Sequence, residues 1–177
     1  MIVRELTISE YEARVPRLAE ILIDAVDSGA GVTFMHPLER NVAEAFWKKQ
    51  KADVGSGQTT VFVAEENGVI AGTVMLVKAW PPNQPHRCDV AKLLVHRDFR
   101  RRGLGTLLMQ ALENKARALG MALITFDTVA QSPAETFYRQ LGFTCAGYIP
   151  NYAYTKDKLD ATALFYKELT QAGGEMR

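Results

Sequence analysis

The sequence predicts an α/β fold, of the α+β kind, in which a mixed central β-sheet carries helices on both faces. Antiparallel hairpin signals occupy the first part of the chain. A strand–loop–helix–strand–helix unit follows them, and its strands should pair in parallel. Because no internal repeat or linker interrupts the order β-α-α-β-β-β-α-β-α-β-β, we expect one domain over residues 1–177.

The first part of the chain is typical of one strand and two helices. Residues 3–7 predict a short strand. An apolar periodicity from Pro16 indicates a helix that ends at the Ser-Gly-Ala-Gly segment over 28–31, because glycine commonly follows the C-terminal end of a helix. Pro37 suits the first turn of a second helix, which we expect to end near Val54.

A hairpin and a further strand come next. Residues 59–65 and 69–78 flank Asn67-Gly68, and Asn-Gly is a strong hairpin signal. A stiff, proline-rich connection over 81–85 then leads into a strand over 87–96.

The second half of the chain alternates helices and strands. Its helices show apolar residues at helical spacing, and its strands are short and largely apolar, as in the middle of a sheet. We expect, in order, a helix over 104–119, a strand over 122–126, a helix from Pro133 to Leu141, strands over 143–148 and 162–168, and a frayed tail from Gln171.

Composition narrows the class of protein. Hydrophobic residues make up 47% of the chain and charged residues 23%, and a net charge of +1 argues against a general nucleic-acid binder. The longest apolar stretch is interrupted by Gly72 and Thr73 and is too short to cross a membrane. Cys88 and Cys145 lack metal-site spacing, so we expect buried core cysteines, no metal and a cytoplasmic protein.

The clearest functional motif lies between the strand over 87–96 and the helix over 104–119. Glycine lets the backbone approach a ligand closely, and the first amides of the following helix have no partner within that helix. With the helix dipole and three arginines, they indicate a site for an anion such as a pyrophosphate. The predicted loop consists of Arg100, Arg101, Arg102, Gly103, Leu104, Gly105 and Thr106.

Three alternative roles for this loop are weaker. The glycines could simply shape a tight turn beside solvated arginines, but their position before a long amphipathic helix favours a binding site. A dinucleotide-binding loop needs a glycine where Arg100 stands. A Walker-type loop needs Gly-Lys-Ser/Thr, which does not follow.

Two segments resemble a known family. Residues 90–96, followed by Arg100-x-x-Gly-x-Gly, resemble the central acetyl-CoA signature of the GNAT superfamily of N-acetyltransferases. Residues 137–143 are similar to its second signature, a tyrosine followed one turn later by Gly-Phe. Within the superfamily, the chain most resembles the tabtoxin-resistance acetyltransferases, and that likeness rests on residues 29–35, 126–128 and 162–167.

The resemblance implies direct transfer of an acetyl group from acetyl-CoA to a substrate amine. Residues 101–106 would hold the pyrophosphate, and Gln131 stands where many relatives have a pantetheine-binding asparagine. In the family, the strand before the loop splays from the next one and leaves a cleft for the cofactor. Its backbone would bind the pantetheine and polarise the acetyl carbonyl, here at Leu93, Leu94 and Val95.

The chemistry requires a base and an acid. An alkyl amine has a pKa of about 10.4, so it must lose a proton before it attacks. Asp127, at the end of an apolar strand, is the predicted base, partly desolvated, or else an anchor for the substrate amine. Tyr138 matches the family's usual acid for the CoA thiolate; otherwise it is a core tyrosine. The strand over 87–96 offers Asp89 and Lys92 where many relatives have a glutamate base, and Lys92 is not expected to replace that base.

The acceptor pocket is expected between the early helices and the last hairpin, closed by the loop over 28–37. Phe34, Met35, Tyr152 and Tyr154 are its predicted walls. We expect the amine of a small molecule, such as an amino-acid-like toxin or antibiotic in a detoxification reaction, and a monomer or homodimer. A protein N-terminal or lysine acetyltransferase and a non-catalytic acyl-CoA sensor are the alternatives.

Overall fold

The computed structural model describes residues 1–156 and 158–169, and the predicted tail from Gln171 lies outside them. The predicted order of helices and strands is confirmed, with one additional 3₁₀ turn, η1 (Arg97–Phe99). The strands are β1 (Ile2–Glu5), β2 (Thr59–Glu66), β3 (Val69–Lys78), β4 (Arg87–Val95), β5 (Leu123–Val129), β6 (Thr144–Thr155) and β7 (Lys158–Glu168). The helices are α1 (Ile8–Asp27), α2 (Arg40–Gly55), α3 (Leu104–Ala118) and α4 (Pro133–Gln140).

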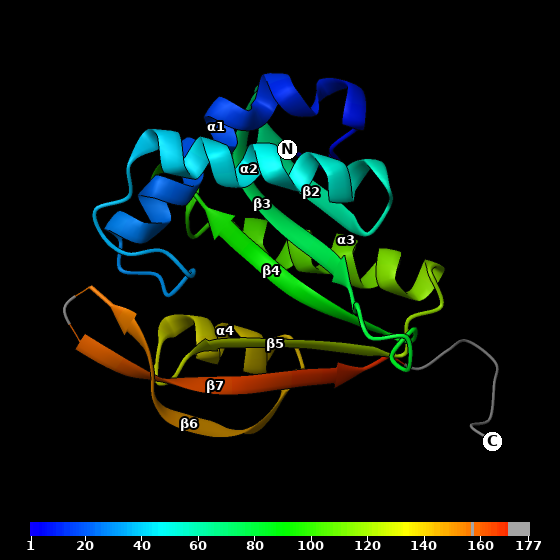
Figure 1. The fold of residues 1–177 in the computed structure, drawn as a ribbon, viewed down its shortest axis with the longest axis vertical. Coiled ribbons are helices and arrows are strands. Elements are labelled where there is room, and N and C mark those ends of the chain that lie inside the picture. Colours follow the sequence, from blue (N-terminus) through cyan, green and yellow to red (C-terminus); the bar gives the residue numbers. More distant parts are fainter. Residues whose placement is uncertain (157, 170–177) are drawn as a thin grey trace.

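The seven strands form one mixed sheet in the order β1-β2-β3-β4-β5-β7-β6 (Figure 1). As predicted, β4 and β5 pair in parallel, and the other neighbouring strands of the described sheet pair antiparallel. The parallel pair needs a crossover, and α3 provides it. The predicted mixed sheet is therefore confirmed.

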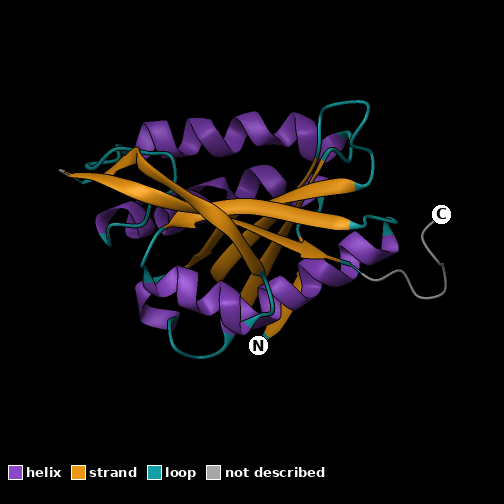
Figure 2. Cartoon of the chain, turned by 90° about the horizontal axis from the view of Figure 1, so that it is seen from below, coloured by secondary structure: helices purple, strands orange, loops and turns teal. Residues whose placement is uncertain are grey.

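Helices cover both faces of the sheet (Figure 2). One apolar cluster packs α1 and α2 against β2 and β3, with Trp47 fully buried in it. A second cluster packs α3 against the opposite face and continues to Tyr138 of α4. None of the helices in the described part of the chain has the length and apolarity that crossing a membrane requires.

The first helix begins earlier than predicted, and Pro16 lies inside it. α1 starts at Ile8 because its entry is capped locally: the Glu10 carboxylate accepts hydrogen bonds from the Thr7 amide at 3.1 Å and the Thr7 hydroxyl at 2.9 Å. A proline inside a helix removes one backbone hydrogen bond. The long buried face of α1 outweighs that loss. The prediction that Pro16 opens the helix was therefore wrong.

The second helix and the last hairpin also differ from the prediction. Pro37 precedes α2, which begins at Arg40. β6 and β7 extend through Thr155 and from Lys158, respectively. The added part of β6 is exposed and irregular, with a register shift between Ile149 and Ala153, so its residues lack the alternating apolar pattern of a half-buried strand.

Candidate functional site

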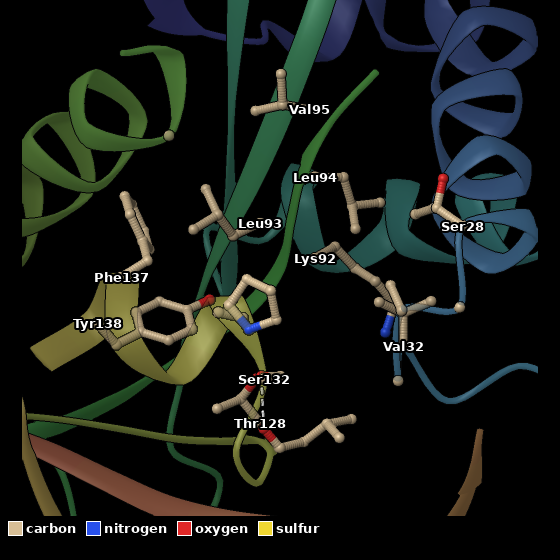
Figure 3. A pocket seen from close by; sticks show the side chains of 18 of the residues that line it. Ser28, Val32, Lys92, Leu93, Leu94, Val95, Thr128, Ser132, Phe137 and Tyr138 are labelled. Atoms are coloured by element: carbon tan, nitrogen blue, oxygen red, sulfur yellow. Dashed lines mark hydrogen bonds between the residues drawn. The ribbon is translucent and has the colours of Figure 1, made fainter. Parts of the chain in front are cut away.

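The sheet splits between β4 and β5. Their pairing extends over residues 87–89 and 123–125, and beyond Asp89 the strands diverge. The separation leaves a cavity of about 1280 Å³ along the remaining length of β4, residues 90–95 (Figure 3). The start of α3, the start of α4 and the segment after α1 close its other sides. Leu93, Leu94 and Val95 all line it.

The backbone at the start of α3 presents a row of free amides. Gly103 adopts φ 77°, a left-handed conformation that favours glycine, and no side chain caps the helix. Among the described residues, the amides of residues 101–106 have no hydrogen-bond acceptor. Gly105 also allows close packing, since a Cβ there would lie 3.2 Å from the Phe137 ring, a tight contact. Of these six residues, all but Arg102 line the cavity, so free amides and the positive end of the α3 dipole lie at one side of it, which suits a diphosphate.

The three arginines of the loop have different surroundings. Arg101 lines the cavity, and its guanidinium contacts no acceptor among the described residues. Arg102 does not line the cavity, because it donates to Glu66 at 2.7 Å and to the Asp98 carbonyl at 2.9 Å. The predicted contribution of Arg102 to phosphate binding is thus not supported by its placement.

Arg100 lines the cavity but is held by the protein. It donates to the Val95 carbonyl at 2.9 Å, to Asp24 at 2.8 Å and to the Ser28 hydroxyl at 3.1 Å. Asp24, which is 5% exposed, also accepts from the amide of Arg97 at 3.0 Å and from its guanidinium. Arg100 therefore ties the end of β4 to the end of α1 and orients the loop that follows.

We expect Asp24→Ala to lower the free energy of unfolding by about 2–3 kcal/mol, because it removes buried hydrogen bonds to charged groups. Urea denaturation measures this difference. Asp98→Ala is the control, since the Asp98 side chain is 73% exposed and lies on η1 beside Arg97, which Asp24 binds. A similar loss in both variants would contradict the anchoring role of Asp24.

β4 is interrupted by a bulge at Lys92. The register with β3 shifts between Thr73 and Met75, and Lys92 adopts φ 50°, a conformation uncommon for residues with a side chain. The extra residue turns the Lys92 side chain into the cavity, where its amine donates to the Thr33 hydroxyl at 3.1 Å. Figure 3 shows Lys92 reaching from β4 toward the segment that carries Val32. Sequence reasoning gives this residue no role, because nothing in the local pattern indicates a bulge.

Tyr138 lies on the opposite side of the cavity, on α4, with its hydroxyl directed into the opening (Figure 3). Its ring packs against Phe126 at a centroid distance of 4.3 Å and against Phe143 at 6.1 Å. The hydroxyl makes no hydrogen bond to the described residues, so the expectation of a core tyrosine with a satisfied hydroxyl does not hold. Burial raises the pKa of Tyr138 above its ordinary value of 10.0, which keeps the hydroxyl protonated at neutral pH.

Asp127 lines the same cavity but is not desolvated as expected. β5 runs on to Val129, so Asp127 lies within the strand, with its side chain exposed. One carboxylate oxygen accepts a hydrogen bond from the Thr162 hydroxyl at 2.8 Å, which orients the group. In the described part of the chain, no three His, Cys, Asp or Glu side chains are grouped as a metal site.

Gln131 does not line the cavity. Its backbone adopts φ 58° at the turn before α4, and its amide donates to Glu135 at 2.6 Å. Ser132, Pro133 and Ala134 line the cavity instead. The predicted pantetheine contact of the Gln131 side chain is therefore not supported by its position.

A second, smaller cavity of about 280 Å³ adjoins the first. Its lining contains the four predicted walls of the acceptor pocket and Asp127, the predicted base or substrate anchor: Phe34, Met35, Tyr152, Tyr154 and Asp127. The segment after α1 packs closely over it, since a Cβ on Gly31 would lie 2.5 Å from Cγ2 of Val129 and 3.3 Å from Cγ2 of Thr155. The segment after α1 therefore forms one tightly packed wall of this cavity.

Comparisons with known proteins give a family. Residues 24–143 match the model of the acetyltransferase (GNAT) family. An N-acetyltransferase of Azospirillum brasilense, described as uncharacterised, is 32% identical over 112 residues, which span 62% of this chain and 65% of that protein. The aligned segment thus covers slightly less than two thirds of that relative.

Solved structures share the fold. A ribosomal-protein-alanine N-acetyltransferase of Brucella melitensis superposes with a TM-score of 0.77 at 20% identity, over 96% of this chain and 100% of that one. A candidate acetyltransferase of Salmonella typhimurium, solved with its cofactor acetyl-CoA, gives a TM-score of 0.76 at 20% identity, over 99% and 98% of the two chains. The resemblance to tabtoxin-resistance enzymes stays a prediction.

Proposed function

Because the chain belongs to the acetyltransferase (GNAT) family, we propose that it transfers the acetyl group of acetyl-CoA to the amine of a small molecule. The observation that carries this proposal is the row of free amides over residues 101–106, directly beside the open edge of β4. Such amides bind a diphosphate, and the neighbouring strand edge can bind an extended amide-containing chain. Coenzyme A has both groups in that order.

The protein would act mainly by position and proton transfer. Residues 101–106 hold the diphosphate, and the backbone of Leu93, Leu94 and Val95 holds the pantetheine arm. An amide of this strand edge polarises the thioester carbonyl. Asp127 takes the proton of the attacking amine, directly or through water. The N–C bond forms, the C–S bond breaks, and Tyr138 protonates the departing thiolate, so that N-acetylated amine and CoA result.

The size of the second cavity supports a small acceptor. At about 280 Å³, it has room for a compact molecule rather than for a longer peptide segment of a protein. The close packing of Gly31 on β5 and β6 further narrows the approach. Detoxification of an amino-acid-like compound agrees with this size. The two free cysteines agree with a cytoplasmic location.

Release of free thiol from acetyl-CoA tests the proposal, across amines, amino acids, aminoglycosides and peptides. We expect release with a set of small amines and little with peptides. Release with peptides alone would instead favour a protein acetyltransferase. Calorimetric binding of CoA without thiol release for any acceptor would favour an acyl-CoA sensor.

We expect Asp127→Asn to reduce kcat/KM more at pH 7 than at pH 9.5, because the acceptor amine is more fully protonated at the lower pH and depends more on a base. Steady-state rates at both pH values measure the effect. Asp53→Asn, on α2 outside both cavities, is the control. A higher KM with unchanged kcat at every pH would make Asp127 an anchor for the substrate rather than the base.

A further inference from the structure

Lys92 is a cation with few partners in the middle of the proposed site. Its amine can donate three hydrogen bonds, and the Thr33 hydroxyl, at 3.1 Å, accepts one of them. The aromatic rings of Phe34 and Phe46 lie with their centroids 5.7 Å and 5.1 Å from the nitrogen. No carboxylate of the described residues lies within salt-bridge distance.

The surroundings of Lys92 penalise a lone charge. Burial lowers the pKa of Lys92, and the opposing attraction of Asp127 is the weaker effect. A half-buried ammonium without a counter-ion gains from an anion that enters the cavity. Because the cation is already partly desolvated and oriented, binding that anion requires little further ordering of the protein.

The Lys92 amine is directed to the acceptor side of the site. It contacts Thr33 and lies over Phe34, and both residues also line the second cavity. The amides over residues 101–106 follow the C-terminal end of β4, and none of these residues lines the second cavity, so the donor's phosphates have their own site. Asp127 lines both cavities as well. A positive group and a negative group therefore face the place where the acceptor must enter.

We propose that Lys92 binds a carboxylate of the acceptor while Asp127 faces its amine, so that the substrate is an amino acid or a closely related amino carboxylate. This inference rests on the proposed acetyltransferase function. Lys92 directly precedes Leu93, whose backbone is assigned to the thioester end of the donor. A carboxylate on the carbon next to the amine can therefore reach Lys92 while the amine reaches the thioester.

Matched acceptors test the inference. Each of the twenty amino acids is compared with its α-carboxamide, which has nearly the same shape but no negative charge at the α-carboxyl position. The amine of an amino amide loses its proton more readily, so a preference for the acid cannot come from the amine. The wild type, Lys92→Met, Lys92→Arg and the control Lys78→Met are compared by thiol release, and CoA affinity is measured by calorimetry. Lys78, at the end of β3, lines neither cavity.

We expect the wild type to prefer acids over amides by about 10- to 100-fold in kcat/KM. This is the size of effect expected when a substrate loses a hydrogen-bonded charge pair with the protein. Lys92→Met should remove this preference through KM while CoA affinity stays unchanged. Lys92→Arg should restore part of it, and Lys78→Met should behave like the wild type.

Three results would overturn the inference. Equal use of acids and amides by the wild type would exclude carboxylate recognition. An equal loss of kcat for both acceptor types in Lys92→Met would make Lys92 a structural or proton-transferring residue. A Lys92-dependent preference for succinyl-CoA over acetyl-CoA would assign the carboxylate to the donor. In each case acetylation itself persists, whereas a complete absence of thiol release would refute the proposed function first.

Discussion

Tyr138→Phe is expected to lower kcat by about 10²- to 10⁴-fold, the usual size of general acid–base catalysis. The hydroxyl of Tyr138 points into the cavity with no partner among the described residues, so its proton is available to the thiolate. The phenylalanine ring keeps the contacts with Phe126 and Phe143, so we expect CoA affinity to remain nearly unchanged. Single-turnover kinetics and calorimetry measure the two quantities separately.

Tyr11→Phe is the control for this substitution. Tyr11 is also buried, but its hydroxyl donates to the Trp47 carbonyl at 3.1 Å, between α1 and α2 and away from the cavity. This variant should lose about 1 kcal/mol of unfolding free energy and keep its turnover. Wild-type turnover in Tyr138→Phe would exclude Tyr138 as the acid.

Gly103→Val is expected to weaken CoA binding by about 100-fold or more, since each charge-assisted hydrogen bond contributes about 1.5–3 kcal/mol. Valine strongly disfavours the φ of 77° that Gly103 adopts. The loop must therefore rotate, and several amides over residues 101–106 no longer point at one place. No atom outside the immediate chain neighbours lies within 4 Å of a Cβ at Gly103, so the effect acts through the backbone rather than through a clash.

Gly57→Val separates this effect from general strain. Gly57 adopts φ 73° after α2, a Cβ at this position would likewise meet no such atom within 4 Å, and the residue lines neither cavity. Both variants should lose similar thermal stability, but only Gly103→Val should lose CoA affinity in isothermal titration. Unchanged affinity in Gly103→Val would remove the phosphate-binding role of the loop.

Element order could be predicted because turn residues and apolar spacing are local signals. Asn67-Gly68 marks the hairpin between β2 and β3, and Gly120 closely follows the end of α3. The predicted start of α1 was wrong because Pro16 is normally a helix-start signal, whereas the Thr7 cap lies about two and a half turns earlier. Tertiary packing, which the sequence does not display, lets the helix continue through the proline.

Site residues were predictable where the local backbone conformation determines their role. They were less predictable where distant side-chain partners determine their position. Gly103 signals the loop directly, because its conformation strongly favours glycine. The different placements of Arg100 and Arg102 depend on Asp24 and Glu66, which lie far away in the chain. The role of Lys92 could not be predicted because its direction depends on a bulge, and the register of β3 with β4 defines that bulge only in three dimensions.

The short parallel pairing of β4 with β5 also affects the resistance of the protein to unfolding and proteolysis. Three residues on each strand join the two halves of the sheet, so a donor bound between the halves would link them through its own contacts. Any ligand that binds the folded state alone stabilises it against unfolding by an amount that grows with the free ligand concentration relative to the dissociation constant. We therefore expect the lifetime of this protein under proteolysis to follow the local concentration of acyl donor, so that the enzyme persists where its donor is plentiful and is degraded where the donor is scarce.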